Sequence, residues 1–221
     1  MTNPESARKR RRLIRRLVLT AAALGIWFWT QSLIARRTAP VSGVGDALHT
    51  LTAGLNSYFY HSPSAANALL IVSSALIDGL ALFLLARWLF GPSVRPFLGL
   101  VLLLGLRQIM QAVCALPAPP NMIWHYPGFP SLLVTYSVGN DFFFSGHTAI
   151  AVFGGIELAR LGKRWLAILA VGIVLFEIAA VLVLRAHYTM DVFTGLLAAL
   201  CVAQFCGKVS PGIDAWLTPA E

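Results

Sequence analysis

Charged residues are scarce in this sequence, and acidic ones are the scarcest. Asp, Glu, Lys and Arg together make up 12% of the 221 residues, and only 9 of them are acidic. A soluble domain carries about 25% charged residues, so these proportions argue against a soluble globular protein. Hydrophobic residues reach 57%, and mean hydropathy is +0.73. The composition predicts an all-α protein that crosses a membrane several times.

Cysteines, repeats and linkers are also lacking. The three cysteines, Cys114, Cys201 and Cys206, lie in apolar stretches, and no pair has the spacing of a metal site. They indicate packing residues and not a disulfide framework. No internal repeat and no linker marks a second domain. We therefore expect a single domain embedded in the membrane.

Basic residues are plentiful only near the N-terminus. The net charge is +8, and seven cations gather in residues 8–16, directly before the first apolar run. A high net positive charge is common in nucleic-acid-binding proteins, but a cluster in this place is typical of a cytoplasmic flank that touches anionic lipid. We divide the chain into a basic cytoplasmic tail (1–16), a transmembrane domain (17–206) and a cytoplasmic C-terminal tail (207–221).

Six apolar windows are long enough to cross a bilayer, which requires about 20 residues. The first exceeds the apolar core of a signal peptide, about 7–15 residues, and offers only a weak cleavage site, so we expect it to be retained. The six windows cover 17–35, 68–90, 96–116, 142–161, 165–184 and 188–206.

Lys and Arg are unevenly shared between the two sides of this topology. Thirteen lie on the N-terminal side, and only Arg36, Arg37 and Arg185 lie on the other. Both termini are therefore expected in the cytoplasm, with the connections 36–67 and 117–141 on the exoplasmic or periplasmic side. Apolar residues near helical spacing in 46–60 predict an interfacial helix. Five prolines predict that the second connection is an ordered cap without a helix.

Two short segments place a histidine at the start of an apolar window. They read Asp141-Phe-Phe-Phe-Ser-Gly-His147-Thr and His187-Tyr-Thr-Met-Asp191. Both windows begin on the outer face, so the two histidines enter the membrane at one level. One membrane histidine alone can serve as an interhelical hydrogen-bonding group. Two histidines and an aspartate at such positions favour a functional site, because buried ionisable groups are costly in a membrane.

The spacing within each segment suggests roles for these residues. His187 and Asp191 share a helix face, so the carboxylate can accept the ring N–H and leave the other nitrogen free as a nucleophile or base. His147 follows Ser145 and Gly146 at a helix start, where free backbone N–H groups bind anions. The pattern predicts chemistry on a phosphate, with His147, His187 and Asp191 as catalytic residues.

These motifs resemble the catalytic motifs of sphingomyelin synthases, the headgroup-transferring branch of the type 2 phosphatidic acid phosphatase superfamily. Ser145-Gly146-His147-Thr148 carries the likeness together with His187–Asp191, and 107–120 resembles the branch's arginine-to-Leu-Pro-x-Pro segment. The resemblance covers 107–195. It implies a six-helix bundle with the site at the outer face.

The chain departs from the phosphatase branch in its cations. Residues 98–120 lack that branch's Lys-x6-Arg-Pro element, and Val181 stands six before the second histidine, where the phosphatases carry arginine. A phosphomonoester carries nearly two negative charges and a phosphodiester one. With Arg107 and Arg185 as the candidate cations, the pocket suits a diester. Gly139-Asn140 also replaces the Cys-Gly of sphingomyelin synthases, which leaves the acceptor open.

Several polar residues are expected near the phosphate or substrate, and some have an alternative role. Asp141 can instead cap a helix, and Arg107 can pack against a helix or snorkel. Glu177 is a candidate partner for a histidine, whereas Asp78 and Glu157 are expected in interhelical bonds. The expected phosphate or substrate contacts are Arg107, Ser145, Gly146, Asp141, Arg185 and Tyr188.

We interpret the chain as a membrane phosphotransferase. It would move a phospholipid headgroup to a lipid alcohol, such as ceramide or diacylglycerol, through a phosphohistidine at His187, with His147 as acid and base. We expect no metal, no cofactor and no nucleic-acid partner. The alternative enzymes are a lipid phosphate phosphatase and a phospholipase C-like hydrolase that uses water as the acceptor. The non-enzymatic alternative is a transporter with a histidine proton relay. The headgroup and the oligomeric state stay open.

Overall fold

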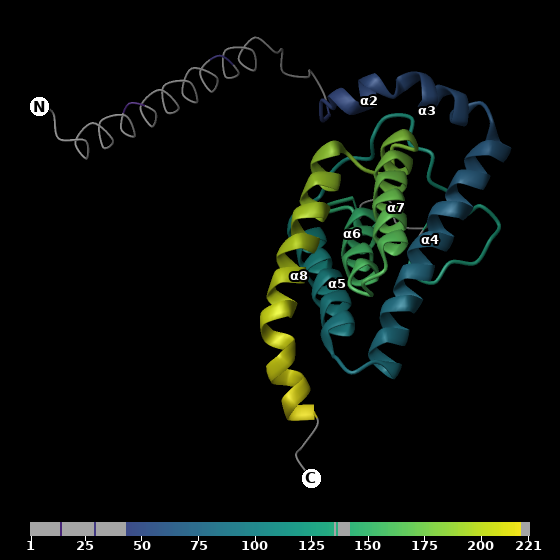
Figure 1. Cartoon of the computed structure of the whole chain (residues 1–221). Helices are drawn as coiled ribbons and strands as arrows, with labels where there is room; N and C mark the ends of the chain where they lie inside the picture. Colours follow the sequence, from purple (N-terminus) through teal and green to yellow (C-terminus); the bar gives the residue numbers. More distant parts are fainter. Residues whose placement is uncertain (1–13, 15–28, 30–42, 135, 137–141, 218–221) are drawn as a thin grey trace, which may run out of the picture. The chain divides into compact units, whose positions relative to one another are not determined.

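The computed structural model describes residues 14, 29, 43–134, 136 and 142–217 (Figure 1). The chain divides into two compact units, Met1–Gly45 and Asp46–Glu221. Of the first unit, the structure describes Ile14 and Trp29, which are helical and exposed, and 43–45. The rest of the basic tail and of the first apolar window lies outside the described residues. Helices α2 to α8 all belong to the second unit, and its described part contains no strand.

Two short helices precede the bundle. They are α2, Ala47–Leu51, and α3, Ala53–Tyr60. Asp46 caps α2, because its carboxylate accepts hydrogen bonds from the backbone N–H groups of Leu48 and His49. Both helices pack against the helix α7 of the bundle (Figure 1). The expected helix in 46–60 is thus present in two pieces, and its place on a membrane surface stays a prediction.

Four long helices build most of the bundle. In length and composition each is suited to cross a membrane, and the four correspond to the second, third, fifth and sixth predicted windows. Six spans are therefore not found within the described ranges. The four helices are α4, Pro63–Phe90, α5, Arg95–Val113, α7, Arg164–Val183, and α8, Thr189–Leu217.

The fourth window forms a shorter helix than the sequence predicts. We expected a span over 142–161, but α6 covers Gly146–Ala159, only 14 residues. It begins late because the Ser145 hydroxyl caps it and accepts from the backbone N–H of Thr148 at 3.3 Å. Ten of its residues are buried, and it packs against α4, α5, α7 and α8 (Figure 1). Helix α6 is therefore the central helix of the bundle.

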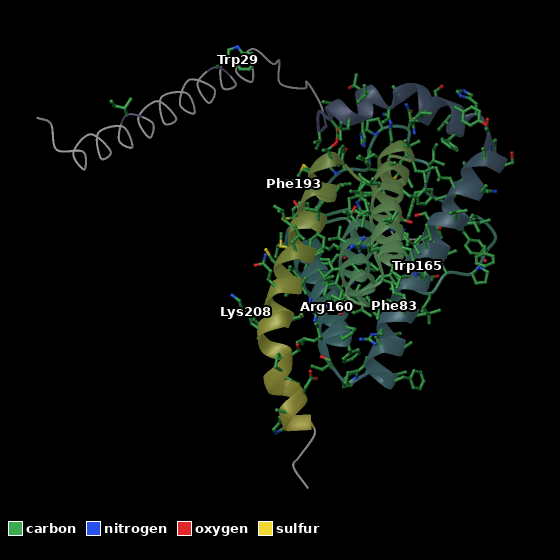
Figure 2. The ribbon with its side chains drawn as sticks, in the orientation of Figure 1. Trp29, Phe83, Arg160, Trp165, Phe193 and Lys208 are labelled. Atoms are coloured by element: carbon green, nitrogen blue, oxygen red, sulfur yellow. The ribbon has the colours of Figure 1, made fainter. Side chains whose placement is uncertain are left out.

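Large apolar side chains cover the outside of the long helices. Trp165 of α7 and Phe193 of α8 are 59% and 60% exposed, and Figure 2 shows Phe193 on the outer side of α8. Glu157 and Glu177, in contrast, are buried inside the bundle. Ionisable groups turned inward and apolar groups turned outward are the arrangement that lipid requires. Together with the four long apolar helices, this arrangement identifies a membrane protein.

Two of the acidic residues tie different parts of the bundle together. Glu157 of α6 pairs with Arg95 of α5 at 2.6 Å, and both side chains are buried, which is the interhelical bond that we expected. Asp78 differs from the expectation, because its two oxygens accept from the backbone N–H groups of Leu132 and Leu133. Residues 114–134 contain no helix, so their backbone groups need partners elsewhere. Asp78 thus anchors this connection to α4.

Replacing Arg95 by methionine should destabilise the bundle. The Glu157 carboxylate would remain buried without its close partner, and breaking such a pair costs about 3–5 kcal/mol. Arg160→Met is the matched control, because Arg160 also approaches Glu157, at 3.8 Å, but its side chain is 57% exposed. Its loss should cost at most about 1 kcal/mol. Thermal unfolding in detergent micelles measures both variants, and an Arg95→Met melting temperature equal to that of the wild type would contradict this account.

Candidate active site

The two histidine motifs meet where α6 and α8 begin. The backbone N–H of Ser145 donates a hydrogen bond to the carbonyl oxygen of Asp191 at 3.1 Å. Gly195, one turn further along α8, makes this approach possible. A Cβ at that position would lie only 2.6 Å from the carbonyl oxygen of Ser145, so a side chain there would force the helices apart. The two motifs, distant in sequence, are fixed side by side.

A cavity of about 60 Å³ lies at this junction. His147, His187 and Arg107 all line it, so the structure brings together three residues that the sequence singled out in separate segments. Gly146 contributes backbone to the same wall. The remaining lining residues are apolar: Ile77, Leu104, Trp124, Leu133, Val134, Phe142, Ile150 and Ala186.

His147 and Arg107 form one side of the cavity. His147 is the second residue of α6 and only 8% exposed, and its buried Nε2 has no hydrogen-bond partner among the described residues. The guanidinium of Arg107 reaches the start of the same helix, where its Nε donates to the carbonyl oxygen of Phe144 at 3.1 Å. A Cβ on Gly146 would lie 3.0 Å from that Nε. A cation thus adds to the positive end of the helix dipole, which favours an anion.

His187 and Asp191 form the other side, with a geometry that differs from the expected one. We expected the carboxylate to accept the ring N–H. The Nδ1 of His187 lies 3.8 Å from Oδ2 of Asp191, which is too long for a hydrogen bond. The reason is that Oδ2 accepts instead from the backbone N–H of Tyr188 at 2.9 Å. The carboxylate therefore holds the backbone beside the ring and makes no hydrogen bond to the ring itself.

Ser145 and Tyr188, two other residues expected near the phosphate, have side chains with partners elsewhere. The hydroxyl of Ser145 accepts from both the backbone N–H and the hydroxyl of Thr148, so it serves the helix cap. Tyr188 is 1% exposed, and its ring stacks on His49, with centroids 5.5 Å apart. Within the described residues, neither side chain belongs to the lining of the cavity.

Arg185 is engaged in the loops that surround the site. One of its nitrogens donates to the carbonyl oxygen of Pro120 at 3.0 Å, and another to that of His49 at 3.1 Å. It does not line the cavity that the structure describes, and its expected phosphate contact stays a prediction. Asp141 lies outside the described residues, and its role stays a prediction.

Sequence reasoning missed four residues around the site. Trp124 lines the cavity, with its ring edge-on to His147 at 5.4 Å between centroids. Asp46, His49 and Asn56 hold the connection that carries His187. Only Asp46 had a local signal, as a helix-capping residue before an apolar run. The other contacts join residues far apart in sequence, and no local pattern predicts them.

Glu177 is occupied elsewhere. Its Oε2 accepts from the hydroxyl of Ser73 on α4 at 2.7 Å, so the structure gives it an interhelical bond and not a histidine partner. Within the described residues, no group of three or more His, Cys, Asp or Glu side chains could hold a metal ion.

The arrangement suits a reaction at phosphorus. Two buried imidazoles can serve as nucleophile and as acid or base. The α6 N-terminus and Arg107 can stabilise the charge on phosphate oxygens. The apolar remainder of the wall lowers the local dielectric constant, which strengthens these electrostatic effects.

Replacing Gly195 by alanine should separate the two motifs. The new methyl group would clash with the backbone of Ser145, which cannot move without disturbing the start of α6. We expect a clearly lower melting temperature in detergent. Gly172→Ala is the control, since a Cβ there meets nothing within 4 Å and alanine favours the helix over glycine. Equal melting temperatures for the two variants would show that the close contact is not needed.

Comparison with known proteins places these residues in a family. A family model described as AtPDCT1/2 matches residues 45–208, which include both histidine motifs. The phosphatidylcholine:diacylglycerol cholinephosphotransferase 1 of Arabidopsis thaliana is 23% identical over 180 residues. The match covers 81% of this chain and 57% of that relative, so the chain spans little more than half of the relative's length.

No solved structure matches the chain. The sphingomyelin synthase branch, expected from the motifs, is not the family that matches, and that finer assignment stays a prediction. The matched region begins just before α2 and ends within α8, and it contains every residue that lines the cavity. The chain belongs to the AtPDCT1/2 family.

Proposed function

We propose that the protein transfers the headgroup of a phospholipid, foremost phosphocholine, to the hydroxyl group of diacylglycerol. The observation that supports the proposal most is the presence of His147, His187 and Arg107 in one cavity. The name of the Arabidopsis relative, a cholinephosphotransferase, points to the same donor and acceptor.

In the first step, Nε2 of His187 attacks the phosphorus of the donor. A P–N bond forms and the P–O bond to diacylglycerol breaks, with the electron pair going to the glycerol oxygen. His147 in its protonated form gives that oxygen a proton. Asp191, 3.8 Å from Nδ1 of His187, offsets the positive charge that the ring acquires. Arg107 offsets the charge on the phosphate oxygens.

In the second step the same groups work in reverse. His147, now neutral, takes the proton from the hydroxyl of a second diacylglycerol. The oxygen attacks phosphorus, and the P–N bond breaks with its electron pair returning to His187. The headgroup has been transferred to the second diacylglycerol, and both histidines have returned to their initial protonation states. Water in place of the acceptor would give a hydrolase, and ceramide would give the activity of a sphingomyelin synthase.

The charge of the cavity favours a phosphodiester over a phosphomonoester. Arg107 is the one Lys or Arg among the described lining residues, since Arg185 binds two backbone carbonyls elsewhere. A diester carries one negative charge and a monoester nearly two. One guanidinium therefore matches a diester, which argues against the lipid phosphate phosphatase.

The site is proposed to face away from the cytoplasm. His147 begins α6, whereas the Arg95–Glu157 pair lies near the other end of that helix. The side of the bundle with Arg95 and Arg160 is the one that the Lys and Arg bias assigns to the cytoplasm. The substrates would then enter from the outer leaflet.

Alanine substitution of His187 should abolish transfer. Purified protein in mixed micelles receives phosphatidylcholine and radiolabelled diacylglycerol, and the label that appears in phosphatidylcholine is measured. We expect a fall of at least 1,000-fold for His187→Ala and for His147→Ala, because each removes a reacting group. His61→Ala is the control, since His61 is exposed and bonds only to its own helix. Transfer by His187→Ala near the wild-type rate would end the nucleophile assignment.

Replacing Arg107 by glutamine should separate charge stabilisation from folding. We expect kcat/KM for headgroup transfer to fall about 100-fold, as when one donor to a developing oxyanion is lost. Arg107→Lys should retain part of the activity, because it keeps the charge without the planar donors.

Wild-type protein given phosphatidic acid should release no inorganic phosphate. Phosphate release without headgroup transfer would favour a phosphatase instead.

A further inference from the structure

Three polar residues outside the bundle contact the end of α7, the start of α8 or the connection between these helices. Asn56 of α3 donates from Nδ2 to the carbonyl oxygen of Val183 at 2.9 Å. His49 of α2 lies with Nε2 at 3.0 Å from the carbonyl oxygen of His187. Both side chains are buried, with 2% and 5% exposed. Buried polar groups need hydrogen-bond partners, and here each finds one in the backbone at or shortly before His187.

Asp46 holds the residue that opens α8. Its carboxylate accepts from the backbone N–H of Thr189 at 2.6 Å and from the hydroxyl of Thr189 at 2.7 Å. Burial raises the pKa of Asp46, but the hydrogen bonds from Thr189 and the nearby His49 outweigh it and hold the pKa below its usual value. The carboxylate is therefore ionised at neutral pH. One side chain thus caps the N-termini of both α2 and α8.

The connection needs such support. Arg185 lies in it with a φ of +55°, a left-handed conformation that side chains other than glycine rarely adopt. Such a residue keeps its conformation only where the surroundings impose it. The carbonyl oxygen of His49 accepts from the guanidinium of Arg185, so α2 supports this residue as well. A change in α2 would loosen the segment on both sides of His187.

At its Nδ1 side, the ring of His187 is not directed by a hydrogen bond from any described residue. Its Nδ1 lies 3.8 Å from Asp191 and has no hydrogen-bond partner among the described residues. The direction of the ring therefore depends on the backbone of residues 187–189, and a carbonyl oxygen is fixed there by His49. Because that oxygen can only accept, the Nε2 of His49 must carry the proton.

We propose that Asp46 and His49 are positioning residues that hold the backbone of His187 so that its ring faces the phosphorus. The inference rests on the proposed function, in which His187 is the nucleophile. It adds α2, outside the two histidine motifs, to the machinery of transfer. A misplacement of the nucleophile by about 1 Å can cost a factor near 100 in rate without weakening substrate binding.

Three variants of His49 and two of Asp46 test this role. His49→Gln keeps an N–H donor at the same reach but loses the ring that stacks on Tyr188, whereas His49→Phe keeps a stacking ring and loses the donor. His49→Ala loses both. Asp46→Asn keeps one acceptor for Thr189, and Asp46→Ala keeps none. Each protein is tested for kcat and KM of headgroup transfer in micelles, and for melting temperature.

The hydrogen-bond donor at position 49 should matter more for kcat than the aromatic ring at that position. We expect kcat to fall about tenfold or more in His49→Phe and Asp46→Ala, with KM for phosphatidylcholine within twofold of the wild type. His49→Gln and Asp46→Asn should keep at least half of the wild-type kcat. Wild-type kcat in His49→Phe and Asp46→Ala would overturn the proposal. A parallel fall of kcat and melting temperature in His49→Gln and His49→Phe would also overturn it, as a purely structural role.

A readout that needs no turnover separates this inference from the proposed function. Diethyl pyrocarbonate modifies accessible imidazoles, and mass spectrometry follows its reaction with His187 over time. We expect the reaction to be several times faster in His49→Phe than in the wild type or His49→Gln. If the wild type transfers no headgroup, the proposed function fails, but a faster reaction in His49→Phe still supports positioning. Equal modification rates in all the proteins would overturn positioning, whatever the activity.

Discussion

The hydrogen bond from the N–H of Ser145 to the carbonyl oxygen of Asp191 is the constraint on which the site depends. It joins the residue that caps α6 to the first turn of α8, beside the two histidines that line the cavity. A single such bond contributes only about 1 kcal/mol to stability. Its effect here is to fix the position of the two helix starts. They can approach this closely because Gly195 has no side chain, and a Cβ there would lie 2.6 Å from the carbonyl oxygen of Ser145. Any drift of one helix start would carry a histidine away from the other.

Helix α6 is held at both ends, and these contacts fix the place of the site in the bundle. At its start it is tied to α8, and Arg107 of α5 donates to the residue before its cap. Near its end, Glu157 is tied to Arg95 of the same α5. The helix has only 14 residues and packs against α4, α5, α7 and α8. Sites carried by such fixed elements keep their geometry better than sites on loops.

The sequence allowed much of the fold to be predicted, and less of the site. The length of the apolar windows was sufficient to predict the four long helices. It did not predict the start of α6, which begins later than its apolar window because Ser145 caps it. The pairing of the two motifs followed from helix direction alone. The bonds of Asp191, Arg185 and Asp78 did not, because each of these side chains meets backbone groups in a connection. Neither hydrophobic periodicity nor residue spacing records which backbone group a polar side chain meets, and the contact of His49 with His187 spans 138 residues.

The central claim is that the headgroup passes through a covalent bond to His187. The most direct test incubates the purified protein with phosphatidylcholine labelled in its phosphate, quenches the mixture within milliseconds in alkaline denaturant, and locates the label by mass spectrometry of peptides. The account predicts phosphocholine on His187, stable in alkali and labile in acid, and formed fast enough to precede the transferred product. Label on another residue, or transfer with no labelled protein at any quench time, would contradict it.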